Sequence, residues 1–440
     1  MAAESFGNIF RVPELKKKIL FTLALLVVYR IGAHIPTPGI NSVALAELFA
    51  RAQGTILGFF DMFSGRALSR LTIFALGIMP YISASIILQL MTIVSPYLAR
   101  LKKEGEQGQK KITQYTRYGT VLLSTIQGSG IAVGLEAMKS PGGSPIVPDP
   151  GWDFRLMTVL TLTAGTSFLM WLGEQITERG IGNGISLIIF SGIVAGTPAA
   201  IFQSLDLMGT GEMSVLVMLF LLVLMIAVVG AIVFTEGGQR RIPIQYAKRV
   251  VGRKMMGGQS THLPLKVNTS GVIPPIFASS IIMFPATIAQ FISHPWMQTV
   301  SAMLTPGTIV YSLIFIGAIF FFCYFYTAVI FNPVDVADNM KKHGGFIPGV
   351  RPGKKTAEFI DNILTKITLP GSFALAFIAV LPYFIMKITG VGFNLAMFFG
   401  GTSLLIIVGV ALDTLQQIES HLLMRHYDGF MKSGRMRGRR

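Results

Sequence analysis

Residues 71–99 read LTIFALGIMPYISASIILQLMTIVSPYLA and contain no charged side chain. Arg70 and Arg100 flank the stretch directly, so charge marks both of its limits. A helix needs about 20 apolar residues to cross the hydrocarbon core of a bilayer. This stretch is therefore predicted to contain a membrane-spanning helix.

Stretches of the same kind recur along the whole chain. Further charge-free runs cover 118–135, 156–173, 180–205, 213–235, 367–386 and 388–412. The run 267–334 is long enough for two spans, and proline-containing segments at 294–296 and 305–307 separate them. A shorter run, 19–29, becomes a span if Arg30 reaches the interface. We therefore predict an all-α membrane protein with ten transmembrane helices.

The basic residues lie almost entirely in every second gap between these runs. Thirty of the 37 lysines and arginines fall before residue 19, within 100–117, at 179, within 240–266, within 341–366 or after 424. The other gaps hold only Arg51, Arg66, Arg70, Lys139, Arg155 and Lys387. Because basic loops stay on the cytoplasmic side, both termini are predicted to be cytoplasmic.

The overall composition excludes a disordered chain and an ordinary soluble domain, because 52% of the residues are hydrophobic and only 13% are charged. In a soluble protein the net charge of +16 would suggest nucleic acid as a partner. Here the charge lies in cytoplasmic loops, so insertion topology and anionic lipids account for much of it. A ribosome or an acidic cytosolic partner also fits. Cys323 is the only cysteine, so no intrachain disulfide and no cysteine-based metal site is expected.

An internal repeat relates two of the predicted spans. Residues 77–87, GIMPYISASII, open the second span, and residues 271–281, GVIPPIFASSI, open the seventh. Five spans separate the copies, and an odd number inverts one half relative to the other. Chance similarity of two Gly- and Ser-rich helices is the alternative. We divide the chain into a cytoplasmic lead (1–18), an N-terminal half (19–205), a C-terminal half (206–417) and a basic tail (418–440).

Three loops differ from simple connections. The external loop 36–70 contains the apolar segment 56–65, which is too short to span and is either re-entrant or an interfacial amphipathic helix. The cytoplasmic loop 236–266 alternates near 241–246 and has glycines beyond, which predicts a protruding hairpin. The cytoplasmic loop 332–366 contains turn signals at 344–345 and 348–353.

Ionisable residues avoid the predicted span centres, since Arg30, Glu136, Glu174, Glu178 and Asp413 all lie near span ends. An ion-coupled secondary transporter would need carboxylates or histidines at depth. An intramembrane enzyme would need an aspartate pair, a Ser–His dyad or zinc ligands there. The sequence disfavours both classes, and we interpret the Glu174/Glu178 pair as a solvated helix end rather than as catalytic acids.

Small and aliphatic side chains occupy the span interiors instead. Ile82 and Ile86 are one helical turn apart on the second span, and the repeat aligns Ile276 with Ile82. An aliphatic constriction can keep a pore dry. Lipid contact or ordinary helix packing explains the same residues, so the residues alone leave this choice open.

Several long motifs resemble the bacterial branch of the SecY/Sec61-alpha family. Residues 74–87, FALGIMPYISASII, are similar to the second helix of that family. The other matching segments cover 103–106, 113–119, 170–186, 259–268, 331–333 and 400–406. The resemblance extends over essentially the whole chain and is weakest in the external loops and the basic tail.

The resemblance implies the pore subunit of the general protein-secretion channel, which is not an enzyme and needs no cofactor or metal. Two inverted five-helix halves would surround a central hourglass pore that passes unfolded preproteins and releases hydrophobic helices sideways into lipid. The implied pore ring is Ile82, Ile86, Ile189, Ile276 and Ile406. The implied plug covers about 58–70 and includes Phe60, Met62, Phe63, Ser64 and Gly65. A lateral gate would contain Ile87, Gln127, Asn268, Phe284 and Thr287.

The same resemblance implies a set of partners and a location. The motor ATPase SecA or the ribosome would dock on Lys248, Arg253 and Arg351 of the cytoplasmic loops. The small membrane subunits SecE and SecG, signal peptides, preprotein clients and anionic lipids are the other implied partners. The protein would be a multi-pass component of the bacterial cytoplasmic (inner) membrane.

The charge pattern makes a direct topology prediction. Single cysteines introduced at Ser144 and Gly257, in a chain without Cys323, should react with an impermeant thiol reagent from opposite sides of the membrane. Labelling intact and opened vesicles measures this. Reaction of both positions from the same side would contradict the topology.

Overall fold

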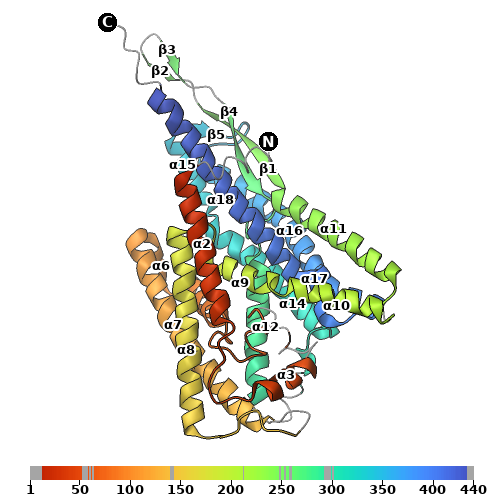
Figure 1. Cartoon of the computed structure of the whole chain (residues 1–440). Coiled ribbons are helices and arrows are strands. Elements are labelled where there is room, and N and C mark those ends of the chain that lie inside the picture. The colour runs from red at the N-terminus through yellow and green to blue at the C-terminus, as the bar shows by residue number, and fades with distance from the viewer. Residues whose placement is uncertain are drawn as a thin grey trace.

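The computed structural model describes residues 12–51, 58, 61, 64–138, 143–211, 213–246, 249–251, 254–256, 260–291, 299 and 302–433. The described chain is a bundle of long helices, with a β-hairpin projecting beyond the helix ends at one end (Figure 1). The start of the first helix and the end of the last lie at this same end. The short helix α3 and the turn between α7 and α8 lie at the opposite end (Figure 1).

The N-terminal half is entirely helical in its regular structure. Its helices are α2 (Pro13–Gly32), α3 (Ser42–Arg51), α5 (Met79–Val94), α6 (Pro96–Lys103), α7 (Glu106–Ala137), α8 (Trp152–Arg179), α9 (Gly184–Val194) and α10 (Thr197–Gly209). Prolines occupy the first turn of α2, α5, α6 and α10, where a missing N–H costs nothing. The Asn183 side chain caps α9 by accepting from the N–H groups of Ile185 and Ser186.

The C-terminal half combines helices with short strands. It contains α11 (Val215–Gly237), α12 (Ile273–Phe291), α14 (Ile309–Ile330), α15 (Pro333–Lys342), α16 (Lys354–Thr389), α17 (Phe393–Phe399) and α18 (Gly401–Ser433). The strands are β1 (Gln239–Tyr246), β2 (Arg249–Val251), β3 (Lys254–Met256), β4 (Ser260–Lys266) and β5 (Gly345–Phe346). Ser214 and Thr308 cap α11 and α14 through their hydroxyl oxygens.

The predicted hairpin in the loop 236–266 is confirmed. Strands β1 and β4 pair antiparallel from Gln239 opposite Lys266 to Gln245 opposite Ser260. Ile242, Ile244 and Leu265 pack with Ile347 and Ile360 in a separate apolar cluster outside the main bundle. The short strand β5 pairs with β1 and ties the loop 332–366 to the hairpin.

Many of the helices have the length and composition of membrane spans. Six helices or continuous helix pairs pass such a test alone: 152–179, 184–209, 215–237, 309–342, 354–389 and 395–423. The pair α5–α6, bent by 99° at Ser95–Pro96, makes a seventh. Helix α12 is apolar but short in its described part, α2 includes Lys16, Lys17 and Lys18, and α7 is rich in hydroxyl side chains. The length and hydropathy of these three helices indicate a membrane span less strongly, but the charge pattern predicts a span at each of the three positions.

Three helix limits differ from the charge-free runs. Helix α2 starts at Pro13, so it already includes the lysines expected in the cytoplasmic lead. Helix α5 starts at Met79, because residues 71–78 form turns that end at Gly77 with φ +57°. Helix α18 continues to Ser433, well into the expected tail. Charge marks where a helix meets water, whereas prolines and glycines set where it begins.

The internal repeat is present in the backbone as well as in the sequence. Gly77 and Gly271 occupy equivalent positions and have φ values of +57° and +59°. Helices α5 and α12 then begin two residues later, at Met79 and Ile273, each with proline in its first turn. Both glycines have a positive φ, a backbone conformation that other residues rarely adopt. Because this conformation recurs at the same position of the repeat, chance similarity of the two helices is an inadequate explanation.

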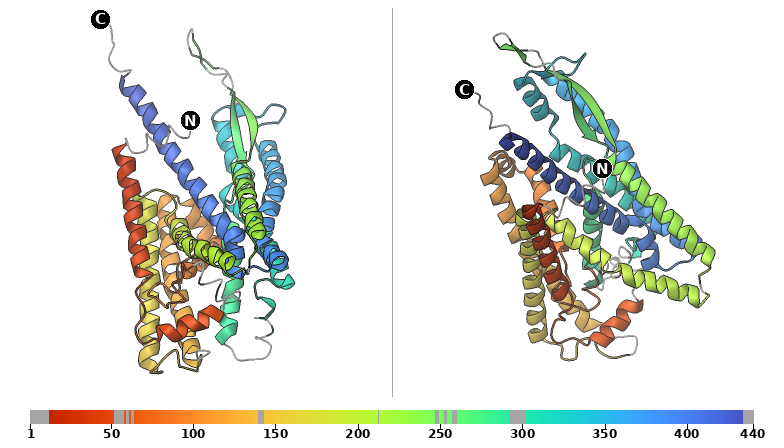
Figure 2. Two further views of the ribbon diagram at one scale, coloured as in Figure 1. Left: turned by 45° about the vertical axis from the view of Figure 1, so that its right-hand side comes forward. Right: turned by 45° about the horizontal axis from the view of Figure 1, so that its top comes forward.

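The two halves meet along two different seams. Helix α12 packs against α5 and α7 on one side of the bundle. Helix α18 packs against α9 on another, where the Gly182 N–H donates to Gln417 Oε1 at 2.9 Å. Figure 2 shows α9 and the start of α18 near the middle of the molecule, between the red-to-yellow helices of the N-terminal half and the blue helices of the C-terminal half.

Candidate functional site

The five isoleucines of the expected pore ring come from four helices. Ile82 and Ile86 lie on α5, Ile189 on α9, Ile276 on α12 and Ile406 on α18. Each side chain is at most 5% exposed. All five belong to one continuous cluster of buried apolar residues that includes both halves. The lipid-facing interpretation of these isoleucines is therefore wrong, and they lie where helices of the two halves meet.

The loop 36–70 returns into the bundle after α3. Ser64 is 2% exposed, and its carbonyl accepts a hydrogen bond from the Tyr29 hydroxyl at 3.3 Å. The Gly65 carbonyl lies 3.5 Å from Nη1 of Arg30, so this arginine faces the loop. A Cβ built at Gly65 would lie 2.8 Å from the Gly192 Cα of α9. Ser64 and Gly65 thus lie inside the helix bundle, whereas most of the apolar segment 56–65 lies outside the described residues.

The plug residues fall partly outside the described structure. Phe60, Met62 and Phe63 lie outside the described residues, whereas Ser64 and Gly65 are buried as described above. Asp61 accepts a hydrogen bond from the Ser69 N–H at 2.7 Å, which closes the turn 61–69. Burial raises the pKa of the Asp61 carboxyl, and the hydrogen bonds from Ser69 oppose that effect.

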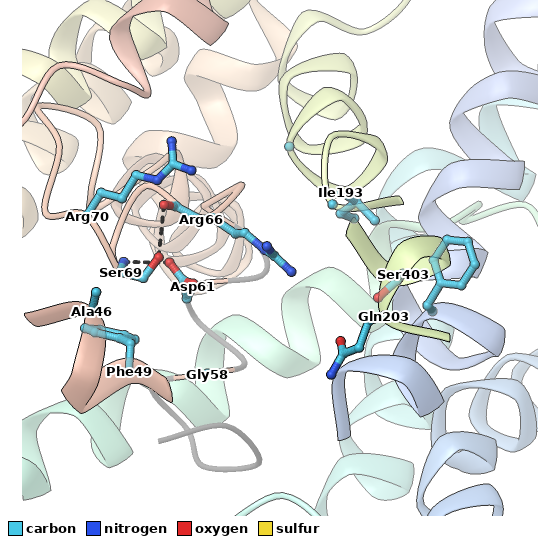
Figure 3. A pocket seen from close by; sticks show the side chains of 14 residues that line it. Ala46, Phe49, Gly58, Asp61, Arg66, Ser69, Arg70, Ile193, Gln203 and Ser403 are labelled. Atoms are coloured by element: carbon cyan, nitrogen blue, oxygen red, sulfur yellow. Dashed lines mark hydrogen bonds between the residues drawn. The ribbon is translucent and has the colours of Figure 1, made fainter. Parts of the chain in front are cut away.

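A cavity of about 340 Å³ lies between this loop and helices of both halves. Figure 3 shows Asp61, Arg66 and Arg70 on one side, and Gln203 and Ser403 on the other. Asp61 and the arginines belong to the loop, Gln203 to α10 and Ser403 to α18. The cavity is therefore a vestibule of mixed polar and apolar lining beside residues 58–70, on the opposite side from the β-hairpin.

The structure describes the side chains of only some of the expected gate residues. Ile87 on α5 is 50% exposed. The Oε1 atom of Gln127 on α7 is buried without a hydrogen-bond partner among the described residues. Phe284 and Thr287 belong to α12, but their side chains lie outside what the structure describes. At the seam itself, Ser280 Oγ of α12 lies 3.9 Å from Met79 Sδ of α5.

Asn268 is buried, and its side chain forms hydrogen bonds within the C-terminal half. Its amide donates to Glu236 Oε1 at the end of α11 at 2.6 Å and to the Gly271 carbonyl at 2.9 Å. Ser270 Oγ donates to Asn268 Oδ1 at 3.0 Å. The asparagine therefore joins the end of α11 to the turn before α12, a role that the sequence did not indicate.

Of the three expected docking residues the structure describes one, Arg351, which lies in the loop at the hairpin end. Arg351 is exposed in the turn between β5 and α16, and its carbonyl accepts from Thr356 Oγ1 at 3.0 Å. Lys248 and Arg253 lie outside the described residues, beyond the far end of β1. Among the residues that the structure describes, no group of three or more His, Cys, Asp or Glu could hold a metal ion.

Comparison with known proteins identifies the family. A family model described as SecY matches residues 72–415. The protein translocase subunit SecY of Escherichia coli K12 is 52% identical over 429 residues, which cover 97% of this chain and 96% of that protein. The chain belongs to the SecY family. The subunit of the same name from Aquifex aeolicus is 47% identical and is covered over its full length.

Solved structures share the fold at much lower identity. A structure described as a protein-conducting channel has a TM-score of 0.66 at 18% identity, with 92% of each chain covered. Sec61 in a canine ribosome–channel complex from the endoplasmic reticulum has a TM-score of 0.61 at 17% identity. The chain is therefore a multi-pass, helical membrane protein with the channel fold of the SecY family, and the prediction of this family and fold class is confirmed.

Ion pairs between neighbouring helices were not among the contacts predicted from the sequence. Glu174 is not a solvated helix end, because its two carboxylate oxygens accept from Arg117 at 2.9 and 2.7 Å and its side chain is only 14% exposed. Glu178 is exposed, as expected. The available signal was the position of Arg117 directly before one charge-free run and of Glu174 directly after the next.

The Glu236–Asn268 bond generates a stability prediction. Asn268→Ala leaves the buried carboxyl without its amide donor, which should cost about 1–3 kcal/mol of folding stability. The midpoint of thermal unfolding of the purified complex should fall. Thr269→Ala is the matched control, because the Thr269 side chain is exposed and contacts only the Lys266 carbonyl. Equal midpoints for both variants would contradict the assigned role.

Proposed function

We propose that this chain is the central subunit of a protein translocase, a channel for unfolded preproteins in a bacterial cytoplasmic membrane. The observation that carries this proposal is the burial of five isoleucines from four helices of both halves in one apolar cluster, in a chain of the SecY family. A channel that passes many different chains should bind none of them tightly. An aliphatic neck meets this requirement, since it offers no hydrogen bonds and excludes water.

The proposed neck is closed by two barriers. One is the ring of Ile82, Ile86, Ile189, Ile276 and Ile406. The other is the plug at 58–70, including Phe60, Met62, Phe63, Ser64 and Gly65. Two weak bonds, from Tyr29 and Arg30 to backbone carbonyls, support a plug that can leave its position. The vestibule beside it would receive the plug or the emerging chain.

A lateral gate is proposed at the seam of α5 and α7 with α12. The described parts of α5 and α12 contain no charged residue, so their contact can open toward lipid without breaking an ion pair. Ile87, Gln127, Phe284 and Thr287 would line the route of a hydrophobic helix, with Asn268 acting at the base of α12. A hydrophobic signal peptide is the ligand that this seam fits.

The proposed energy source is outside the chain. SecA or the ribosome would dock on the cytoplasmic loops through Lys248, Arg253 and Arg351, with SecE, SecG and anionic lipids as further partners. The docking loops, the start of α2 and the end of α18 lie at one end of the molecule (Figure 1), which fits cytoplasmic termini. A channel of this kind is not an enzyme and needs no cofactor.

The neck can be tested by ion leak. Replacing Ile82 and Ile276 together with Asn should raise the resting ion conductance of reconstituted channels, because polar groups let water enter a narrow aliphatic neck. Deleting residues 58–70 in addition should raise it further, because plug and ring act as separate barriers. Ile93→Asn, at an exposed position of the same helix α5, is the matched control outside the ring. A combined variant with native conductance would reject the ring.

The docking loops can be tested by charge reversal. Arg253→Glu or Arg351→Glu should impair motor-driven preprotein transport, since a charge-assisted contact contributes about 1.5–3 kcal/mol. Insertion should be unaffected, because other cations keep each loop cytoplasmic. The control is Lys341→Glu, a reversal on the exposed face of α15 in the same loop. Native transport by both arginine variants would reject the docking assignment.

A further inference from the structure

Helices α7 and α8 are joined by an ion pair at each end, and the two pairs have opposite polarity. Arg117 of α7 donates to both carboxylate oxygens of Glu174 of α8, at 2.9 and 2.7 Å. At the other end, Arg155 of α8 donates to Glu136 of α7, at 2.9 and 2.6 Å. The Arg117 contact is bidentate and therefore fixes orientation as well as distance, whereas both Arg155 nitrogens donate to the single Oε2 atom of Glu136.

Both acids are mostly shielded from water. The side chains of Glu136 and Glu174 are 9% and 14% exposed, whereas those of their arginines are 37% and 48% exposed. The second oxygen of Glu136 also accepts from the Gly151 N–H at 3.1 Å, which ties the α7–α8 turn to the same carboxylate. These pairs are therefore more constrained than an exposed pair such as Lys110–Glu106, whose side chains are 75% and 85% exposed.

The spacing of the pairs matches a bilayer. On each helix nineteen residues separate the two ion-paired positions, 117 to 136 on α7 and 155 to 174 on α8. At 1.5 Å per residue this is about 28 Å, close to the hydrocarbon thickness of roughly 30 Å. One pair therefore lies at each interface, where charged groups are hydrated on one side and shielded by lipid on the other.

The contact between the two pairs is continuous. Between the two pairs, four of the five buried residues of α7 are small and recur at every fourth position: Thr120, Ser124, Gly128 and Ala132. A Cβ at Gly128 would lie 3.7 Å from the Val159 Cα of α8. Thr125 and Thr163 place their hydroxyl oxygens 3.5 Å apart between the helices. Small residues allow this close approach of two membrane helices.

The opposite side of α7 has no such restraint. Helix α12, which α7 also contacts, contains no ionisable side chain in its sequence, so no ion pair can hold the two together. The strongest polar contacts of α7 thus go to α8 within its own half. We infer that Arg117–Glu174 and Glu136–Arg155 are positioning pairs that make α7 and α8 one rigid unit, so that the gate opens by moving both helices away from α12.

This inference rests on the proposed lateral gate, and distance measurements separate the two ideas. Spin labels at exposed positions, Leu122 of α7, Leu160 of α8 and Ile281 of α12, report the α7–α8 and α7–α12 distances. The channel complex, with Cys323→Ala, is placed in lipid nanodiscs, and a synthetic signal peptide is the probe. On peptide addition the α7–α12 distance should lengthen by several ångströms while the α7–α8 distribution stays unchanged.

Charge variants test the pairs themselves. Arg155→Glu should broaden the α7–α8 distance distribution. Glu136→Arg combined with Arg155→Glu should restore the native distribution, and this rescue would not occur if either residue had a merely structural role. Lys110→Glu, which breaks an ion pair within α7 only, should leave the distribution native. If a single reversal does not fold, Glu136→Gln and Glu174→Gln together provide the same comparison without a repulsive contact.

Three results would overturn the inference. An α7–α8 distance that changes with the peptide as much as α7–α12 rejects the rigid unit but leaves the gate intact. A constant α7–α12 distance rejects the gate, and with it the function of the pairs. Native α7–α8 distributions in the single reversal and in the double glutamine variant show that helix packing alone holds the unit together.

Discussion

Lipid offers no hydrogen bonds, so every irregular backbone segment at membrane depth must be satisfied inside the protein. Residues 64–78 show how this is achieved. The Thr37 N–H donates to the Leu71 carbonyl at 2.8 Å and the Ile73 N–H donates to the Ile35 carbonyl at 3.0 Å, so the chain entering and leaving the loop pairs with itself. The surrounding helices then cover this pairing, and the position of α5 follows from it.

Close packing around this segment depends on residues without side chains. A Cβ at Gly165 of α8 would lie within 2 Å of the Ile73 carbonyl oxygen, and one at Gly32 of α2 would overlap the Phe74 ring. Helices α2 and α8 therefore approach the irregular backbone closely enough to exclude lipid. The buried isoleucines Ile82 and Ile86 follow this segment directly, on the first turns of α5.

The architecture followed from the sequence because lipid imposes simple rules. Charge-free runs and the distribution of Lys and Arg indicate where helices cross and which ends share a side, and the 77–87 and 271–281 repeat was visible in the letters. The start of α5 at Met79 was not predictable from charge, because a turn of eight apolar residues looks like helix. The site was harder, because Ile82 has the same composition signal whether it faces lipid, packs or lines a neck. Asn268–Glu236 and Arg117–Glu174 join distant residues, and only the fold brings them together.

The β1–β4 hairpin has a mechanical consequence. Its ladder continues through the Val267 N–H, which donates to the Gly238 carbonyl at 2.8 Å, and the next residue, Asn268, holds both the end of α11 and the turn before α12. Seven paired residues at about 3.3 Å each make an arm of roughly 23 Å. The hairpin is thus joined to the foot of α12 by the short segment 267–272, which these hydrogen bonds hold in place. The β1–β4 hairpin thus links the far end of the molecule to α12, the helix that carries Ile276.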